Sequence, residues 1–410
     1  MKQLQKLDKR LITILLIVFV QMMGYSIMIP ILSLYAQREF ALDERMISVL
    51  ISAFFAAQFV AGPWLGRLSD QYGRVPILIV SQIGTVIAYI MIASAQSVPI
   101  LFAARILDGV TGGNIIVAQA YITDVMPKER RTEALGYIMA ASGVGVFFGP
   151  ALGGVLSSFY GPRMPFWFAA VMAAIVVLIT HITLDESLSA TQRAANRANK
   201  LSDDNLSWGR ILRIRELRYV LSLTFIFEFV SGMFQAALAL WAAAVLFNHY
   251  TPSTVDLGIG LLASLSAITL IVTQTFFLRG LLERMGEINL LILSLITHAV
   301  GMLLLAIFAT LWIIIPGIVL RSFGIGTTYP LLQSLATKIV PEEMRGGVLG
   351  YSNATFSLGT IFGTAIAGLL FEIQPTFQYW VGVGLLLIAM LISIMYREQL
   401  TTQKEQLRVG

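Results

Sequence analysis

Twelve mostly apolar stretches of about 20 or more residues follow one another along the chain, with short polar segments between them. These stretches are residues 11–36, 46–66, 76–95, 99–124, 133–158, 165–184, 217–247, 256–278, 288–309, 311–338, 346–371 and 376–396. A helix rises about 1.5 Å per residue, so about 20 residues cross the roughly 30 Å hydrocarbon core of a bilayer. The pattern therefore predicts an all-α membrane protein with twelve transmembrane helices.

The last six stretches repeat part of the first six. With Pro127 aligned to Pro341, 12 of the 28 positions that end at Gly154 and Gly368 are identical. The matches include Glu129 and Glu343, Arg131 and Arg345, Leu135-Gly136-Tyr137 and Leu349-Gly350-Tyr351, Gly145 and Gly359, and Gly149 and Gly363. A gap of two residues also aligns Arg105 with Arg321. A duplicated membrane protein with charges at depth is typical of secondary transporters.

The duplication predicts four regions. Two pseudo-symmetric halves of six helices each would occupy residues 1–184 and 217–396. Between them, residues 185–216 form a polar linker that is too hydrophilic to enter the bilayer and long enough to let the halves move as bodies. Residues 397–410 would form a cytoplasmic tail.

Composition and charge agree with a membrane protein. The chain is 57% hydrophobic and 12% charged, with a mean hydropathy of +0.79, whereas about a quarter of the residues of a soluble domain are charged. With the N-terminus inside, 23 of the 28 lysines and arginines fall in cytoplasmic segments and three in outer segments, which predicts that both termini are cytoplasmic. The net charge of +5 therefore reflects topology, and we expect no nucleic-acid partner.

Several protein classes are excluded by what the sequence lacks. There is no cysteine, which excludes disulfides and thiol chemistry, and the three histidines have no metal-ligand spacing. The apolar run near the N-terminus is too long for a cleavable signal, so we expect the first helix to remain. No phosphate-binding Gly-Lys-Ser/Thr string is present, so an ion gradient rather than a nucleotide would supply the energy.

Two charged residues lie within the fourth stretch. Arg105 and Asp108 are one helical turn apart, so their side chains can meet on one face of the helix. A charge at the bilayer centre costs roughly 2.5–3.5 kcal/mol, so each needs a partner or a wet cavity. Two interpretations follow. Asp108 gains and loses a proton while Arg105 biases the pKa of its carboxyl, or the two residues form a purely structural ion pair.

Two further charges are predicted near mid-depth, one in each of two later spans. Glu228 lies among Phe225, Phe227 and Phe229, where removal from water disfavours the charged carboxylate. We therefore favour Glu228 over Asp108 as the proton carrier; the alternative is a structural pair with an arginine. Arg321 would counter Glu228 or attract an anionic substrate, and we favour the former because buried charges pair first.

The loop between the second and third spans reads Gly66-Arg67-Leu68-Ser69-Asp70-Gln71-Tyr72-Gly73-Arg74-Val75-Pro76. It resembles the signature G-x-L-x-D-x-x-G-R-[RK] of the major facilitator superfamily, with Val75 in place of a second basic residue. Gly73 would supply a positive φ in this tight turn. The resemblance implies a conformational latch made of Gly66, Asp70, Gly73, Arg74 and Asp124. A worn copy, residues 279–287, lies between the eighth and ninth spans.

The fifth span carries a second motif. Gly145, Gly149 and Gly153 lie on one stripe of the helix, where a second backbone can approach closely, and Pro150 would bend the helix. Plain helix packing would explain the glycines alone. Together with Gly154, however, the string G-x-x-x-G-P-x-x-G-G is similar to the helix-5 signature of drug:proton antiporters in the superfamily. That resemblance implies export.

Two smaller resemblances concern the substrate path. Arg105-Ile106-Leu107-Asp108-Gly109 resembles the antiporter string R-x-x-Q-G, with an acid in place of glutamine. In the superfamily the first, fourth, seventh and tenth helices line a central cavity. The matching positions here are Gln21, Tyr25, Met28, Asn114, Gln119, Phe234, Gln235, Trp241, Tyr329 and Gln333. Aromatic, methionine and amide side chains suit a bulky, largely apolar guest that is recognised loosely.

Together these observations predict a secondary transporter of the multidrug or tetracycline efflux type, which would contribute to antibiotic resistance. It would export small amphipathic compounds in exchange for protons by alternating access. We expect a monomer in the bacterial cytoplasmic membrane, with small-molecule substrate, protons and membrane lipid as partners, no cofactor or metal, and no enzymatic activity. The alternatives are a proton-coupled metabolite symporter, a lipid or glycolipid flippase, and a membrane sensor that transports nothing.

Overall fold

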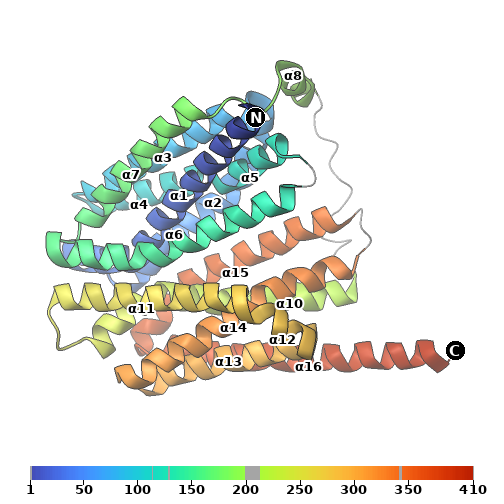
Figure 1. Ribbon diagram of the computed structural model, residues 1–410. Helices are drawn as coiled ribbons and strands as arrows, with labels where there is room; N and C mark the ends of the chain where they lie inside the picture. Colours follow the sequence, from blue (N-terminus) through green and yellow to red (C-terminus); the bar gives the residue numbers. More distant parts are fainter. Residues whose placement is uncertain (1, 113, 128–129, 199–212, 341–343, 410) are drawn as a thin grey trace. The chain divides into compact units, whose positions relative to one another are not determined.

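The computed structural model describes residues 2–112, 114–127, 130–198, 213–340 and 344–409 (Figure 1). The regular elements in these ranges are helices, and no strand is found there. Twelve helical segments of the described chain are long and apolar enough to cross a membrane. They are Lys9–Phe40, Glu44–Tyr72, Arg74–Ala93, Val98–Val125, Glu133–Tyr160, Met164–Thr183, Arg215–Leu246, Pro252–Met285, Glu287–Ile307, Leu311–Lys338, Gly347–Ile373 and Phe377–Met395. Each overlaps one predicted span, so the predicted twelve-helix fold is confirmed.

The helices group into two compact units, each with its own core. The first contains α1 (Lys2–Phe40), α2 (Glu44–Tyr72), α3 (Arg74–Ala93), α4 (Val98–Thr111), α5 (Asn114–Val125), α6 (Arg131–Tyr160), α7 (Met164–Thr183), α8 (Ala190–Ala198) and the first part of α11 (Pro252–Val272) as far as Ser264. Buried apolar side chains from α1, α3, α5, α6 and α7 form a continuous cluster in this unit. Because these side chains pack against one another inside the unit, the opposite faces of the helices are left to contact lipid.

The second unit contains the remaining helices. They are α10 (Arg215–Trp241), the π-helical η2 (Ala242–Leu246), the end of α11, the π-helical η3 (Thr273–Phe277), α12 (Leu278–Met285), α13 (Glu287–Ile307), α14 (Leu311–Lys338), α15 (Arg345–Ile373) and α16 (Phe377–Val409). The α16 helix continues through most of the predicted tail. The middle of the predicted linker, residues 199–212, lies outside the described residues.

The fourth span is described in two parts. The α4 helix ends at Thr111 and α5 begins at Asn114, with residue 113 outside the described residues. The Gly112 N–H bonds to the Gly109 carbonyl rather than four residues back, and its own carbonyl accepts a bond from the Gln58 side chain of α2 at 3.3 Å. Gly112 therefore forms a turn that is bonded to α2.

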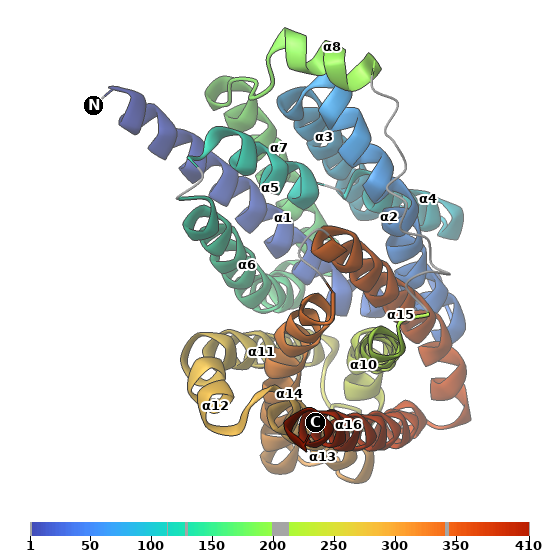
Figure 2. The same cartoon turned by 90° about the vertical axis from the view of Figure 1, so that its right-hand side faces the viewer.

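The duplication seen in the sequence reappears as equivalent helix packing. In the first unit α6 runs along α1 (Figure 1), and in the second α15 runs along α10 (Figure 2). A Cβ added at Gly145 would lie 2.5 Å from the Phe19 carbonyl oxygen of α1, and one at the equivalent Gly359 would lie 2.8 Å from the Phe225 carbonyl oxygen of α10. Both helix pairs therefore approach each other at glycines, as small-residue packing in lipid requires.

Candidate transport site

Arg105 and Asp108 form a buried ion pair on α4. Arg105 Nη1 donates to an Asp108 carboxylate oxygen at 2.9 Å, and the side chains are 2% and 3% exposed. The Arg105 guanidinium also stacks on the ring of Phe54 from α2, 4.3 Å from its centroid. The spacing of three residues on one helix brings the two groups together, and each supplies the partner that a buried charge requires.

Glu228 is held differently, on α10 in the second unit. It is buried, and its carboxyl oxygen lies 3.3 Å from the Thr360 hydroxyl of α15, which donates to it. The neighbouring Gly359 makes room for it, because a Cβ there would lie 2.8 Å from the Glu228 Cβ. Among the described residues no lysine or arginine lies within ion-pair distance of Glu228.

Arg321 lies near Glu228 without pairing with it. Its guanidinium stacks on the Phe234 ring, 3.2 Å from the centroid, and Nε has no hydrogen-bond partner. Glu228 and Arg321 interact electrostatically, but in the described chain no carboxylate lies within 4 Å of the guanidinium. The buried His298 also acts electrostatically on Arg321, and neither of its ring nitrogens has a hydrogen-bond partner among the described residues. Arg321 therefore remains available to Glu228 as a counter-charge.

The residues predicted to line a substrate cavity fall into several groups within the units. Asn114 of α5 donates to the Gln21 side chain of α1 at 3.0 Å, and Gln333 donates to the Tyr329 hydroxyl at 2.6 Å on α14. Tyr25 packs on the rings of Phe54 and Phe55. Met28, Phe234 and Trp241 are buried, whereas Gln119 and Gln235 are half-buried. Contact with substrate remains a prediction for all ten.

The segment predicted as a loop is mostly helical, since α2 ends at Tyr72, α3 begins at Arg74 and only Gly73 lies between them, and an ion network surrounds Arg74 at this junction. Arg74 contacts Asp70 at 2.7 Å and the Asp124 carboxylate of α5 at 2.9 Å. Gly73 has φ of 112°, which confirms the predicted positive φ, and Gly286 in the worn copy has φ of 73°. A side chain at Gly66 would meet nothing within 4 Å, so no contact within the unit requires glycine there.

Sequence reasoning missed the part that Glu186 plays in this network. Its carboxylate accepts the backbone N–H groups of Arg74 at 2.9 Å and Val75 at 3.1 Å, and so caps the start of α3. The linker helix α8 also reaches the loop, where the Asn196 amide donates to the Asp70 carbonyl at 3.1 Å. The Asp-Glu-Ser sequence after α7 was the available signal, since acids near a charged loop favour such contacts.

The predicted glycine stripe faces α1. A Cβ at Gly149 would lie 2.6 Å from the Met23 carbonyl oxygen, and one at Gly153 would lie 3.2 Å from the Ile31 side chain. Gly154, which points away from this stripe, lies against α11, where a Cβ would be 2.7 Å from the Asp256 carbonyl oxygen. The glycines of the motif therefore let α6 pack closely against α1 and α11, and larger residues at these positions would push α6 away from both.

Asp256 near the start of α11 anchors a second ion network that sequence reasoning missed. Its carboxylate accepts a bond from Arg38 of α1 at 2.8 Å and from the Ser157 hydroxyl of α6 at 2.5 Å. The aspartate side chain is 4% exposed and that of Arg38 is 28% exposed. An acid at the edge of an apolar run was the only sequence signal, and its partners lie far away along the chain.

Comparison with known proteins agrees with this architecture. Residues 14–258 and 224–408 match the Major Facilitator Superfamily. The chain is 28% identical to the class H tetracycline resistance protein of Pasteurella multocida, over 97% of this chain and 98% of that protein. It is 27% identical to Multidrug resistance protein 2 of Bacillus subtilis (strain 168), over 93% of this chain and 94% of that protein.

A solved structure gives the same fold. A bacterial homologue of the human lysosomal transporter Spinster superposes with a TM-score of 0.75 at 16% identity, over 95% of this chain and 96% of that chain. At that identity the likeness concerns the fold alone. Two ranges of the chain match the family, twelve helices of its described part are apolar enough to cross a membrane, and both units carry buried charges. This integral membrane protein belongs to the Major Facilitator Superfamily and is a transporter of small molecules, not an enzyme.

Proposed function

We propose that this protein exports small amphipathic, drug-like compounds in exchange for protons. Two observations support export: the relatives named above are resistance proteins for tetracycline and for multiple drugs, and Gly145 to Gly154 resemble the antiporter signature. A cytoplasmic location of both termini in a bacterial inner membrane is part of the proposal and follows from the positive-inside distribution of lysine and arginine.

The proton-carrying role of Glu228 rests on its contact with Thr360, which is the observation that carries the proposal. The Thr360 hydroxyl has one proton and two oxygens in reach, the Phe356 carbonyl at 3.1 Å and the Glu228 carboxyl at 3.3 Å. If Glu228 carries a proton, it can donate to Thr360 while Thr360 donates to Phe356, so both contacts are hydrogen bonds at once. A buried carboxyl without an ion pair is thus well suited to hold a proton.

Arg321 gives the deprotonated form of Glu228 a partner. It lies close enough to act on the carboxylate electrostatically but is held on Phe234 in the structure. Loss of the proton would favour a direct Glu228–Arg321 pair, because a buried unpaired carboxylate is costly. Asp108, in contrast, already has Arg105 at 2.9 Å, so we assign it to that pair and the main proton-carrying role to Glu228.

The proposed cycle follows from these two states of Glu228. A proton from outside binds Glu228 and substrate leaves; release of the proton to the cytoplasm lets substrate bind again. The two six-helix halves, residues 1–184 and 217–396, would alternate access by rocking against each other. The Arg74 network with Asp70 and Asp124 would then act as the cytoplasmic latch in the outward-facing state.

The test is transport in proteoliposomes under an imposed pH gradient, with tetracycline and ethidium as substrates and an internal pH dye as the proton readout. We expect the unaltered protein to accumulate substrate and release protons, and Glu228→Gln to fall to the level of empty liposomes in both readouts. The matched control is Glu372→Gln, which makes the same chemical change at an exposed carboxylate near the end of α15.

The outcomes separate the alternatives. Intact antiport by Glu228→Gln would remove the assignment of the proton carrier. Substrate movement in the same direction as protons would indicate a symporter, and movement of fluorescent lipid instead of drug would indicate a flippase. Absence of any flux from the unaltered protein, with folding verified by its thermal transition, would overturn drug export itself.

A further inference from the structure

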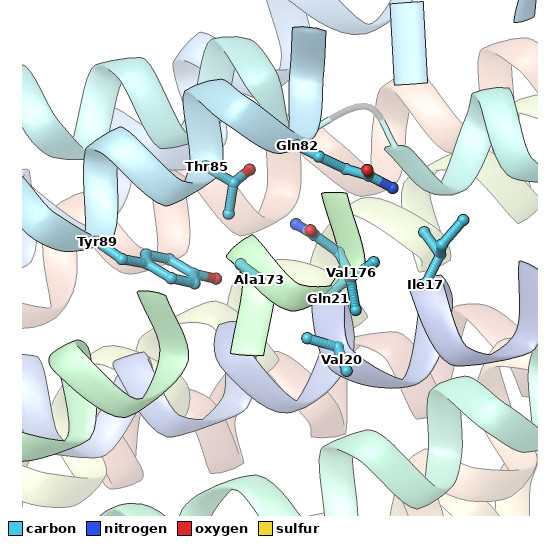
Figure 3. Close-up of a pocket in the computed structure, with 8 residues that line it drawn as sticks. All are labelled: Ile17, Val20, Gln21, Gln82, Thr85, Tyr89, Ala173 and Val176. Carbon is cyan, nitrogen blue, oxygen red and sulfur yellow. The ribbon is translucent and has the colours of Figure 1, made fainter. Parts of the chain in front are cut away.

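A small pocket lies between α1, α3 and α7 of the first unit. Its volume is about 10 Å³, and it is lined by Ile17, Val20, Gln21, Gln82, Thr85, Tyr89, Ala173 and Val176 (Figure 3). All of these except the half-buried Gln21 are buried. Four of the eight side chains are aliphatic and close the walls, while the other four carry polar groups.

Two polar side chains of α3 that line the pocket have no hydrogen-bond partner among the described residues. Both amide atoms of Gln82 and the Thr85 hydroxyl are buried without a hydrogen bond among the described residues. Gln82 and Thr85 are three residues apart, so both lie on the face of α3 that lines the pocket. A buried polar atom without a partner costs about 1–3 kcal/mol, so three on one pocket wall favour the binding of a polar molecule there.

The opposite wall offers a matching polar group. The Gln21 carbonyl oxygen accepts a bond from the Asn114 amide at 3.0 Å, which leaves the Gln21 amide N–H groups as donors. Figure 3 shows the Gln21 amide between Thr85, Tyr89 and Gln82, whereas the amide end of Gln82 points toward Ile17. Donors and acceptors are both present, so the missing ligand must be able to donate as well as accept.

Size identifies that ligand. A buried water needs a cavity of about 10–15 Å³ and two to four polar partners, and the pocket meets both conditions with room for one molecule. We propose that the pocket is a site for a single ordered water molecule, which binds Gln82, Thr85 and Gln21 and joins α3 to the Gln21–Asn114 bond between α1 and α5. This proposal is independent of the role of Glu228, and two of its residues, Gln21 and Asn114, also belong to the predicted substrate cavity.

The water would link three helices of the first unit. Asn114 is the first residue of α5. The bond from Asn114 to Gln21 ties α5 to α1, and a water on Gln21 would tie it onward to α3. A bridging water is nearly as favourable as a direct hydrogen bond, so it would stabilise the packing of these helices.

Thermal unfolding of the purified protein in nanodiscs tests the proposal, with Thr85→Val, Gln82→Met and the double variant. If the water is present, each single variant removes a partner from it and lowers the unfolding midpoint by about 2–4 °C. The double variant then loses less than the sum of the singles, because both act through the same water molecule. The control is Ser81→Ala, another buried unpartnered hydroxyl on α3 that does not line the pocket.

The sign of the shift decides the matter. Without a water, Thr85→Val deletes an unsatisfied hydroxyl and should leave the midpoint unchanged or raise it, as we expect for Ser81→Ala. An unchanged or raised midpoint for Thr85→Val, additive losses in the double variant, or an equal loss in Ser81→Ala would each overturn the proposal.

A direct measurement uses X-ray radiolysis, in which bound water yields hydroxyl radicals that oxidise adjacent side chains. Tyr89 is 2% exposed, so bulk solvent does not reach it, yet its ring lines the pocket. We expect oxidation of Tyr89 in the unaltered protein and its loss in the double variant. Tyr35 is equally buried but bonds the Ile92 carbonyl at 3.1 Å, so it should stay unmodified. Oxidation of neither tyrosine would exclude the water.

Discussion

Glu228 and Asp108 are both buried carboxylates, yet their partners differ. Asp108 has a guanidinium at 2.9 Å on its own helix, whereas the partner of Glu228 in the described part of the chain is a neutral hydroxyl at 3.3 Å on another helix. An ion pair stabilises the charged form of a carboxylate, and a hydroxyl can bond either form. Of the two, Glu228 is therefore the residue that can change protonation state with the smaller disturbance of its surroundings.

The Arg105–Asp108 pair leads to a prediction about stability. Arg105→Leu leaves a buried carboxylate unpaired, and we expect it to lower the free energy of unfolding by about 3–5 kcal/mol. The double variant Arg105→Leu/Asp108→Leu removes both charges and should lie closer to the unaltered protein. Thermal unfolding midpoints of the single and double variants measure this order. If the double variant were less stable than the single variant, the two side chains would stabilise the fold by more than neutralising each other's charge.

Not every residue of these networks could be found from the sequence. The Arg105–Asp108 pair was predictable because both groups lie within one helical turn. The partners of Asp256 were not, because Arg38 is 218 positions away along the chain and Ser157 is 99. Nothing in the local pattern around Asp256 identifies either partner, since only packing of α11 against α1 and α6 brings them together.

At the scale of helices, the two pairs of aligned glycines in the repeat differ in how closely they are packed. Gly149 of α6 and Gly363 of α15 lie against the backbone of a neighbouring helix, whereas Gly136 and Gly350 have open space around them. All four occur at aligned positions of the duplicated segment. The repeated motif thus contains a packing part and a part that packing does not constrain.

This difference predicts the effect of alanine at each glycine. Gly149→Ala and Gly363→Ala would place a methyl group 2.6 Å from the Met23 carbonyl oxygen and 2.9 Å from the Phe229 carbonyl carbon. Overpacking of this kind costs about 1–3 kcal/mol. Gly136→Ala and Gly350→Ala should instead stabilise by about 0.4–1 kcal/mol, because alanine restricts the unfolded chain. Unfolding midpoints measure the contrast, and equal shifts in all four variants would contradict the packing assignment.

At the scale of the whole molecule, the loop after α2 and its worn copy offer a comparison. Asp70 belongs to a network in which Arg74 also binds Asp124 of α5. Among the described residues, Glu283 pairs with Arg279 on its own helix, and those side chains are 64% and 91% exposed. Exposed pairs of this kind contribute little to stability. The first loop therefore joins separate helices, and the second stabilises a single one.

We expect Asp70→Asn to slow substrate turnover several-fold while substrate binding at equilibrium stays unchanged, because the variant weakens a latch and not a binding contact. Glu283→Gln, the equivalent change in the worn copy, should leave turnover at the level of the unaltered protein. Transport rates in proteoliposomes and ligand titration in detergent measure the two quantities. Normal turnover of Asp70→Asn, or an equal loss in both variants, would remove the latch from the proposed cycle.

The sequence by itself determined the twelve helices, the duplication and the family, together with the close approach at glycines of the fifth span. These features are local or repeated, because a bilayer demands about 20 apolar residues for each helix whatever its neighbours are. Only the tertiary structure decided which groups meet across helices: Thr360 with Glu228, 132 positions apart, Glu186 with the start of α3, and the polar pocket around Gln82. Such contacts depend on how helices pack side by side, and no spacing along one helix encodes them.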